Sequence, residues 1–323
     1  IEHIYKRSIY PTLLFAEYNG YKLNIIDTPG ADDFCGGLFS AFKVADVGVM
    51  LINAQNGFEV GSEIQARYAR SHDKPIIAVI NQLDSEKASW EASLDSIRAA
   101  SQVTPVVVQY PVNPGPDFNA FIDVLLMKMY KFKGDTGIRE ELDIPAEEME
   151  RATELNRILT EAAAENDEAL MELYFEKGVL TQDELRSGLK LGLAKRDLIP
   201  VFCASGKRDI GAKRLMEFII NVAPGPLKAP NFVTVDGREI EPDSNGPTAL
   251  FFFKTTVEPH LGEVTYFRVV SGKVTEGMEL VNSKTGNKEK ISQLFAVAGK
   301  NRVKVTEMMA GDIGCTVKLK GTR

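Results

Sequence analysis

The stretch PIIAVINQLD, residues 75–84, is the part of the sequence that most clearly indicates a fold class. Ile76–Ile80 is continuously apolar and mostly β-branched, the pattern of a short strand buried on both faces of a sheet. Asn81, Gln82 and Asp84 follow at once. We therefore predict a buried strand that ends in a polar loop.

Similar short apolar runs occur on both sides of this strand. They are Leu23–Ile26, Val47–Ile52, Pro105–Gln109 and Ile199–Cys203. Helix-like stretches stand between or after them, at Gly61–Ser71, Ser85–Ala100 and Gly211–Val222. Strands separated by helices of this length indicate βαβ units, so we predict an α/β fold with a mostly parallel sheet.

Two further regions break this pattern. Residues 146–176 carry apolar side chains three or four apart, and Thr181–Glu184 is a capping-box signature, so we predict an inserted helical subdomain at about 110–196. Pro- and Gly-rich sequence at 228–247 indicates a linker after a first domain at 1–227. From 248 to 323, short strands alternate with Gly-containing turns, which predicts an antiparallel β-barrel.

Composition excludes several classes of protein. With 44% hydrophobic and 26% charged residues, the chain is neither disordered nor collagenous. No apolar run approaches the roughly 18 residues of a membrane span, so we expect no membrane partner. The cysteines Cys35, Cys203 and Cys315 form no CxxC pair, which favours a reducing, cytoplasmic location. Because the chain begins with Ile1, we expect a fragment.

Charge is unevenly distributed along the chain. The net charge is −7, yet the barrel region is basic and the segment 139–168 is strongly acidic. This asymmetry argues against indiscriminate nucleic-acid binding and leaves room for one surface that meets phosphates and another that meets a protein. A merely solvated acidic helix remains an equally good interpretation of the same pattern.

Asp27-Thr28-Pro29-Gly30 directly follows the strand expected at Leu23–Ile26. An Asp at such a strand end can hold Mg²⁺ through its water shell, and Gly30 can offer its N–H to a γ-phosphate. Taken alone, the motif equally fits a strand that ends in a β-turn.

Two more loops make a nucleotide site the stronger hypothesis. Asn81 can hydrogen-bond a base edge, while the carboxylate of Asp84 can accept both N–H donors of guanine's Watson–Crick edge. Ser205-Gly206-Lys207 follows the strand Ile199–Cys203 and can bring a backbone N–H to the guanine oxygen. All these residues follow strand ends, where an open α/β sheet binds ligands.

Together these residues resemble the translational GTPases, and most closely elongation factor G. The similarity includes Leu23–Gly30, Pro75–Asp84 and Ile199–Ser205, and the barrel contributes Phe267–Gly272 and Ala310–Ile313. The insertion resembles the subdomain that elongation factor G carries inside its GTPase domain. The resemblance implies a P-loop-type GTPase domain followed by the translation-factor β-barrel called domain II.

The sequence departs from this family at four places. No G-x-x-x-x-G-K-[ST] occurs in the chain. Ala31 occupies the position of the family's catalytic His and cannot orient a water molecule. Gln82 replaces the Lys of N-K-x-D, although its amide can still lie along the base plane. Tyr10 falls near the Thr that binds Mg²⁺ in the family and is a poor ligand for a hard cation.

The resemblance implies GTP/GDP and Mg²⁺ as cofactors, with Asp27 as the metal residue. It implies a monomer that acts on the ribosome in translocation, in contact with rRNA and ribosomal proteins, with the stalk protein as a candidate partner of the acidic insertion. Because of Ala31, we expect weak or no GTP hydrolysis. The alternative is a non-hydrolysing ribosome-binding factor for ribosome protection or rescue; a metabolic P-loop enzyme would leave the insertion and barrel unexplained.

Overall fold

The computed structural model describes residues 2–5, 7–234, 236–258 and 261–322, without the side chains of His3 and Asp32. The chain divides into two compact units, and each is described by itself. One unit comprises Val47–Pro224, and the other comprises Ile1–Asp46 together with Gly225–Arg323. Among the described residues, no helix is both long and apolar enough to span a bilayer.

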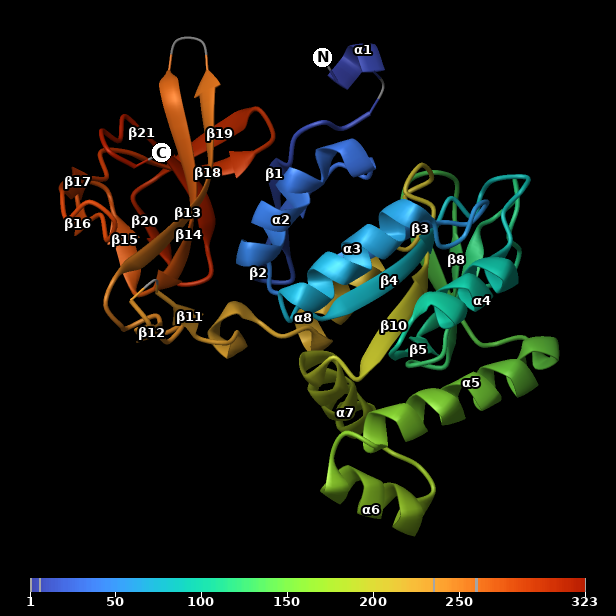
Figure 1. Cartoon of the computed structure of the whole chain (residues 1–323). Helices are drawn as coiled ribbons and strands as arrows, with labels where there is room; N and C mark the ends of the chain where they lie inside the picture. Colours follow the sequence, from blue (N-terminus) through green and yellow to red (C-terminus); the bar gives the residue numbers. More distant parts are fainter. Residues whose placement is uncertain (1, 6, 235, 259–260, 323) are drawn as a thin grey trace. The chain divides into compact units, whose positions relative to one another are not determined.

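A parallel sheet of four strands forms the centre of the unit Val47–Pro224. Its order is β3 (Gly48–Asn53), β4 (Ile76–Asn81), β10 (Leu198–Cys203) and β5 (Thr104–Val107). The helices α3 (Val60–Ser71), α4 (Trp90–Ala100) and α8 (Ala212–Val222) complete this α/β layer, as Figure 1 shows. The prediction of a mostly parallel α/β sheet is confirmed.

The segment expected as an inserted helical subdomain contains three helices. They are α5 (Ala146–Ala164), α6 (Glu168–Lys177) and α7 (Gln182–Lys195). The capping box of α7 is present, with Thr181 N–H donating to Glu184 and Glu184 N–H donating to the Thr181 hydroxyl. The apolar side chains of 146–176 are divided between α5 and α6, because Asp167 caps a new helix by accepting hydrogen bonds from the amides of Ala169 and Leu170.

The same insertion also holds an antiparallel sheet that the sequence patterns did not reveal. Its strands follow chain order, as β6 (Gln109–Pro111), β7 (Ala120–Asp123), β8 (Lys128–Phe132) and β9 (Arg139–Leu142). Phe121, fully buried, packs against Tyr130 and Phe132 with ring centroids 5.6 and 5.5 Å apart. These aromatic contacts give the small sheet its own apolar face.

The other unit contains the N-terminal segment and the C-terminal strands. The segment forms α1 (Glu2–Tyr5), β1 (Thr12–Tyr18), β2 (Tyr21–Asp27), the 3-10 turn η1 (Asp32–Phe34) and α2 (Cys35–Val44). The C-terminal part begins with η2 (Pro226–Lys228), β11 (Phe232–Val233) and β12 (Glu239–Ile240). A five-stranded antiparallel sheet follows, ordered β13 (Ala249–Glu258), β14 (Gly262–Ser271), β21 (Ile313–Val317), β18 (Leu294–Ala298) and β19 (Asn301–Val305).

Two antiparallel pairs complete the barrel region. They are β15 (Lys273–Thr275) with β20 (Glu307–Met309), and β16 (Glu279–Val281) with β17 (Lys288–Lys290). The prediction of antiparallel strands in this region is confirmed.

Strand β2 differs from its prediction. It was expected to be buried on both faces, but no residue of β2 is fully buried, and Ile25 is 41% exposed. The cause is a hairpin: Asn19-Gly20 has φ values of 49° and 78°, which suit a two-residue turn, and β2 pairs antiparallel with β1. A hairpin strand needs to bury only one face.

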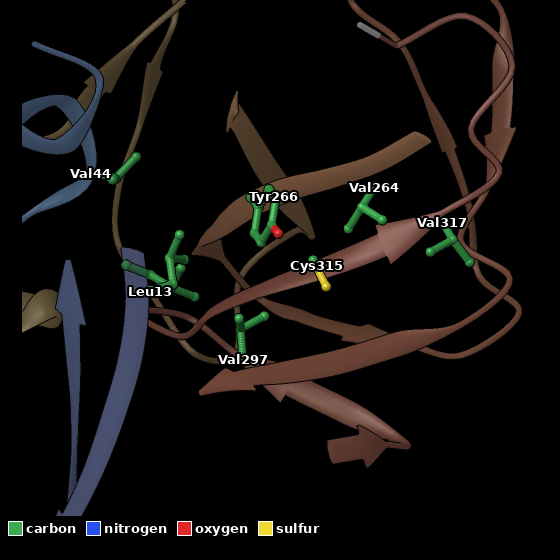
Figure 2. Packing of buried hydrophobic residues seen from close by; sticks show 8 residues of the cluster. Leu13, Val44, Val264, Tyr266, Val297, Cys315 and Val317 are labelled. Atoms are coloured by element: carbon green, nitrogen blue, oxygen red, sulfur yellow. The ribbon is translucent and has the colours of Figure 1, made fainter. Parts of the chain in front are cut away.

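The N-terminal segment shares its core with the barrel strands of the same unit. Figure 2 shows Leu13 and Val44 beside Val264, Tyr266 and Cys315, all of which are buried. A polar contact accompanies this packing, because the buried Arg268 guanidinium bonds to the Val44 carbonyl and lies 2.7 Å from Asp46. Residues 1–46 and the barrel therefore form one compact body.

Candidate functional site

The adjacent strands β4 and β10 bring the predicted base-side residues together. Asn81 is the last residue of β4, and its Oδ1 accepts a hydrogen bond of 2.9 Å from the Gly206 N–H. Ser205, just beyond β10, donates its hydroxyl to Asp84 Oδ1 at 2.7 Å. Four residues from two distant parts of the sequence thus form one linked cluster at the strand ends.

The main chain around this cluster is firmly anchored. Leu83 is fully buried; its N–H donates to the Ala204 carbonyl, and its own carbonyl accepts from the Gly115 N–H at 2.7 Å. Ser205 exchanges two backbone hydrogen bonds with Ile210, at 3.1 and 3.0 Å. These bonds fix the loop after β4 against the loop after β10, so the polar groups are preorganised for a ligand.

Asp84 retains the acceptor capacity that guanine recognition requires. Its side chain is half-buried, and each carboxylate oxygen has two lone pairs, so the Ser205 hydroxyl occupies only part of that capacity. The hydroxyl also restricts the rotation of the carboxylate. The arrangement can therefore accept two parallel N–H donors from one edge of a planar base.

Gln82 lies beside the cluster but has a protein partner. Its backbone is left-handed, with φ of 63°, and its exposed amide oxygen accepts a hydrogen bond of 3.1 Å from Gln55 Nε2. Sequence reasoning missed Gln55, because its position depends on the turn in which the Gly57 N–H bonds to the Asn53 carbonyl. No sequence motif marks that contact.

The remaining residues of the Ser205–Lys207 loop have different surroundings. Gly206 and Lys207 are exposed. Arg208, which sequence reasoning also missed, ties this loop to the insertion through Asp135 at 2.7 Å and through the carbonyls of Pro116 and Phe118. Its guanidinium holds the loop in place.

Asp27–Gly30 belongs to the other unit. Asp27 ends β2, and partial burial together with the negative charge of Glu2 raises the pKa of its carboxyl. Pro29 is buried, Thr28 is half-buried, and Gly30 is exposed with open space where a Cβ would stand. The loop thus leaves the Asp27 carboxyl and the Gly30 main chain accessible.

Two further positions at which the sequence departs from the translational GTPases, Ala31 and Tyr10, lie in the same unit as Asp27. The Ala31 carbonyl accepts from the Phe34 N–H at 3.0 Å, which starts η1, and its methyl side chain has no polar atom. Tyr10 is 59% exposed, and its N–H donates to Glu2 Oε1 at 3.1 Å. Neither side chain is suited to hold a catalytic water or a Mg²⁺ ion.

The donor set fits Mg²⁺ only together with phosphate oxygens. Among the residues that the structure describes, no three His, Cys, Asp or Glu side chains gather closely enough to hold a metal ion. Mg²⁺ commonly binds through one or two carboxylates, water and nucleotide phosphates, so Asp27 alone satisfies the protein's share of such a site. When bound, the ion would neutralise phosphate charge.

Comparison with known proteins supports the same class. Residues 5–225 match the family model of the elongation factor Tu GTP binding domain, and residues 247–323 match that of elongation factor G domain 2. The fold and these matches place the chain in the class of the translational GTPases. The chain belongs to the elongation factor Tu GTP-binding-domain family, and within it the chain is elongation factor G-like, as the resemblance predicted.

Individual relatives agree with this membership. The chain is 32% identical to elongation factor G of Thermotoga maritima over 94% of its own length and 45% of the relative. It is also 32% identical to elongation factor G of Thermotoga neapolitana, over 95% of its length and 45% of that protein. A crystal structure of a Thermus thermophilus protein matches with a TM-score of 0.86 and 25% identity, covering the whole chain and 47% of that protein. The chain spans about half the length of these relatives.

Proposed function

We propose that this chain is part of an elongation factor G-like factor that binds GTP or GDP with Mg²⁺ and acts on the ribosome in translocation. The observation that carries the proposal is the linked cluster of Asn81, Asp84, Ser205 and Gly206 at the ends of β4 and β10. Asp27, Thr28, Pro29 and Gly30 form the phosphate-side group in this assignment, and Asp27 is its metal residue.

Base specificity tests this assignment directly. Guanine offers two N–H donors to a carboxylate, whereas xanthine carries an oxygen in place of guanine's amino group. We expect Asp84→Asn to lose guanine affinity and gain xanthine affinity, because an amide can donate to that oxygen. Ligand-observed NMR with GDP and with xanthosine diphosphate (XDP) measures both affinities. If the Asp84→Asn variant kept the wild-type preference for GDP over XDP, the base would not bind at this site.

Affinity of the isolated chain should be low. The 323 residues contain no G-x-x-x-x-G-K-[ST] loop to supply backbone N–H donors and a lysine to the phosphates. With base-side contacts alone, we expect a dissociation constant for GTP in the millimolar range, which corresponds to about 4 kcal/mol of binding free energy. Calorimetry that gave micromolar binding would show that other residues of this chain hold the phosphates.

Weak or absent hydrolysis belongs to the same proposal. The alternative is a non-hydrolysing factor that protects or rescues ribosomes, and the apolar Ala31 together with the exposed Tyr10 is the reason to keep it as the second candidate. Ribosome-stimulated phosphate release by the full-length protein supports a GTPase. Tight ribosome binding without turnover supports the alternative. In either case we infer a monomer that works in the cytoplasm.

The acidic insertion is proposed to meet a ribosomal protein, with the stalk protein as candidate. Helix α6 has no fully buried residue, and its carboxylates would repel RNA phosphates. Glu161 is a poor cross-linking position, because it already bonds to Arg157 at 2.6 Å and accepts from Tyr174. Glu168 is exposed and suits the experiment. Cross-links from it to rRNA alone would contradict the proposal.

A further inference from the structure

A large groove lies within the unit that contains the barrel strands, and the functions above do not use it. It encloses about 760 Å³ and is lined by Ile9–Pro11, by residues from Asp33 to Ala41, and by Phe253–Val257 of β13. All three segments belong to one compact unit. The groove is therefore a feature of a single body.

The floor of the groove is the open edge of a β-sheet. β13 is the outermost strand of the five-stranded sheet and pairs only with β14 among the described strands. Side chains along a strand alternate between two faces, yet five consecutive residues, Phe253–Val257, line the cavity. A cavity that touches both faces of a strand must run along its edge, where main-chain N–H and C=O groups are unpaired.

The walls of the groove are held in place by close packing. A Cβ built on Gly37 would lie 2.4 Å from Pro11 Cγ, so α2 and the segment before β1 approach as closely as glycine allows. The Lys254 ammonium donates to the Pro11 carbonyl at 2.5 Å. The aromatic residues Tyr10, Phe34 and Phe253 are part of the lining of the groove.

The charges of the lining define the ligand further. The ammonium of the half-buried Lys254 is bonded to the Pro11 carbonyl, so the exposed carboxylate of Asp33 is the more accessible charge among the described lining residues. An exposed carboxylate favours a cationic group and repels the phosphates of a nucleic acid. The rest of the lining is mainly apolar or small.

We propose that this groove binds an extended peptide segment of another protein, apolar at alternate positions and basic at one end, which adds as a strand to the edge of β13. The five lining residues of β13 extend over about 17 Å at 3.4 Å per residue, which is enough for one short strand. A second copy of this chain is a poorer occupant, because its edge strands are attached to folded sheets.

The test uses the 323-residue chain and a fluorescein-labelled peptide, TVTVTVK. We expect saturable binding by fluorescence anisotropy, and roughly tenfold weaker binding when the central valine is replaced by proline, which cannot donate to a strand edge. Replacing the terminal lysine by glutamate should weaken binding about fivefold through Asp33. Hydrogen exchange should slow within Phe253–Val257 when the peptide binds.

Gly36 provides a matched pair of variants. It lines the groove, and nothing lies within 4 Å of the Cβ that a substitution would add. Gly36→Leu should block the groove and weaken binding at least about tenfold, whereas Gly36→Ala should stay within about twofold of wild type. Absence of saturable binding, equal binding of the proline peptide, or indifference to Gly36→Leu would overturn the proposal. Concentration-dependent dimers that Gly36→Leu abolishes would assign the groove to a second copy instead.

Discussion

At the scale of single residues, the Ser205 hydroxyl holds the Asp84 carboxylate in the orientation needed for a base. Ser205 is fully buried and donates to Asp84 Oδ1 at 2.7 Å. A hydrogen bond to a charged group contributes about 1.5–3 kcal/mol, and the lower end applies because Asp84 is only half-buried. We expect Ser205→Ala to weaken GDP binding roughly tenfold in NMR titrations.

Ser101→Ala is the control for that experiment. The Ser101 hydroxyl donates to the Val103 carbonyl at 2.7 Å and accepts from the Val103 N–H at 3.1 Å. It lies near the first residues of β4 and β10, at the opposite end of these strands from Asn81 and Ser205. The Ser101→Ala variant should leave GDP binding unchanged. If both variants lost affinity equally, the loss would reflect general destabilisation of the sheet, and Ser205 would have no specific role.

The three thiols should differ in reactivity and in their effect on stability with pH. Burial raises the pKa of Cys315 to about 11, and burial followed by the charge of Asp123 raises the pKa of Cys203. Cys35 is partly exposed. We expect a thiol reagent at pH 8 to label Cys35 rapidly, and the other two only in denaturant. Rapid labelling of Cys35→Ser would contradict this.

The same shifts predict alkaline destabilisation. The unfolded thiol of Cys315 ionises near its ordinary pKa of 9.0, whereas the folded thiol resists ionisation until about 11. A raised folded pKa gives stability that is present below the unfolded pKa and is lost as pH rises toward the folded one. Urea midpoints should therefore fall between about pH 9 and 11, and Cys315→Ala should reduce that slope.

The clustering of the base-side residues was predictable, because parallel strands end at one edge and polar residues follow β4 and β10. Asn81, Asp84, Ser205 and Gly206 are brought together as that argument requires. The pairing of Gln82 with Gln55 was not predictable, since it joins two loops whose conformations have no sequence signature. Side-chain partners between loops depend on tertiary structure.

At the scale of elements, a buried ion pair joins α8 to the small sheet of the insertion. Arg214 lies 2.8 Å from Asp123, and their side chains are 6% and 0% exposed. Asp123 also accepts from Gln109 at 3.0 Å. Removal of one partner leaves a buried charge, so Arg214→Met should cost about 3–5 kcal/mol of unfolding free energy.

An exposed pair gives the comparison. Arg98 lies 3.1 Å from Asp95 on α4, with both side chains about half or more exposed, and such surface pairs contribute at most about 1 kcal/mol. Arg98→Met should therefore shift the urea midpoint little. If Arg98→Met and Arg214→Met lost comparable unfolding free energy, breaking the buried pair with Asp123 would cost no more than breaking an exposed pair.

The elements themselves were predicted unevenly, for physical reasons. The strands of the parallel sheet were found because burial on both faces leaves continuous apolar runs. Strand β2 was misread because Leu23–Ile26 looks similar, although the Asn19-Gly20 turn signals a hairpin. The strands β6–β9 were missed because each is only three to five residues long, and charged residues such as Lys131 and Glu140 interrupt any apolar pattern in β8 and β9.

At the scale of the whole molecule, the chain combines two electrostatic characters. The insertion carries its carboxylates on exposed helices, whereas the barrel strands carry a basic excess. Long-range fields act on encounter rates and partner choice and contribute little to folding. For a factor proposed to meet both protein and RNA on the ribosome, opposite charges in separate regions provide one surface for each.

Hydrolysis is the property that most depends on the whole protein. Water positioning by a side chain typically contributes about 10²–10⁴ in rate, and Ala31 cannot supply it. We expect full-length protein to bind nucleotide and ribosomes yet release phosphate far more slowly than elongation factor G. Ala31→His should restore part of that rate, whereas Ala31→Leu should not. Multiple-turnover phosphate release with ribosomes measures the hydrolysis rate of the wild type and of both variants. A wild-type rate equal to elongation factor G would show that the water is held by another group.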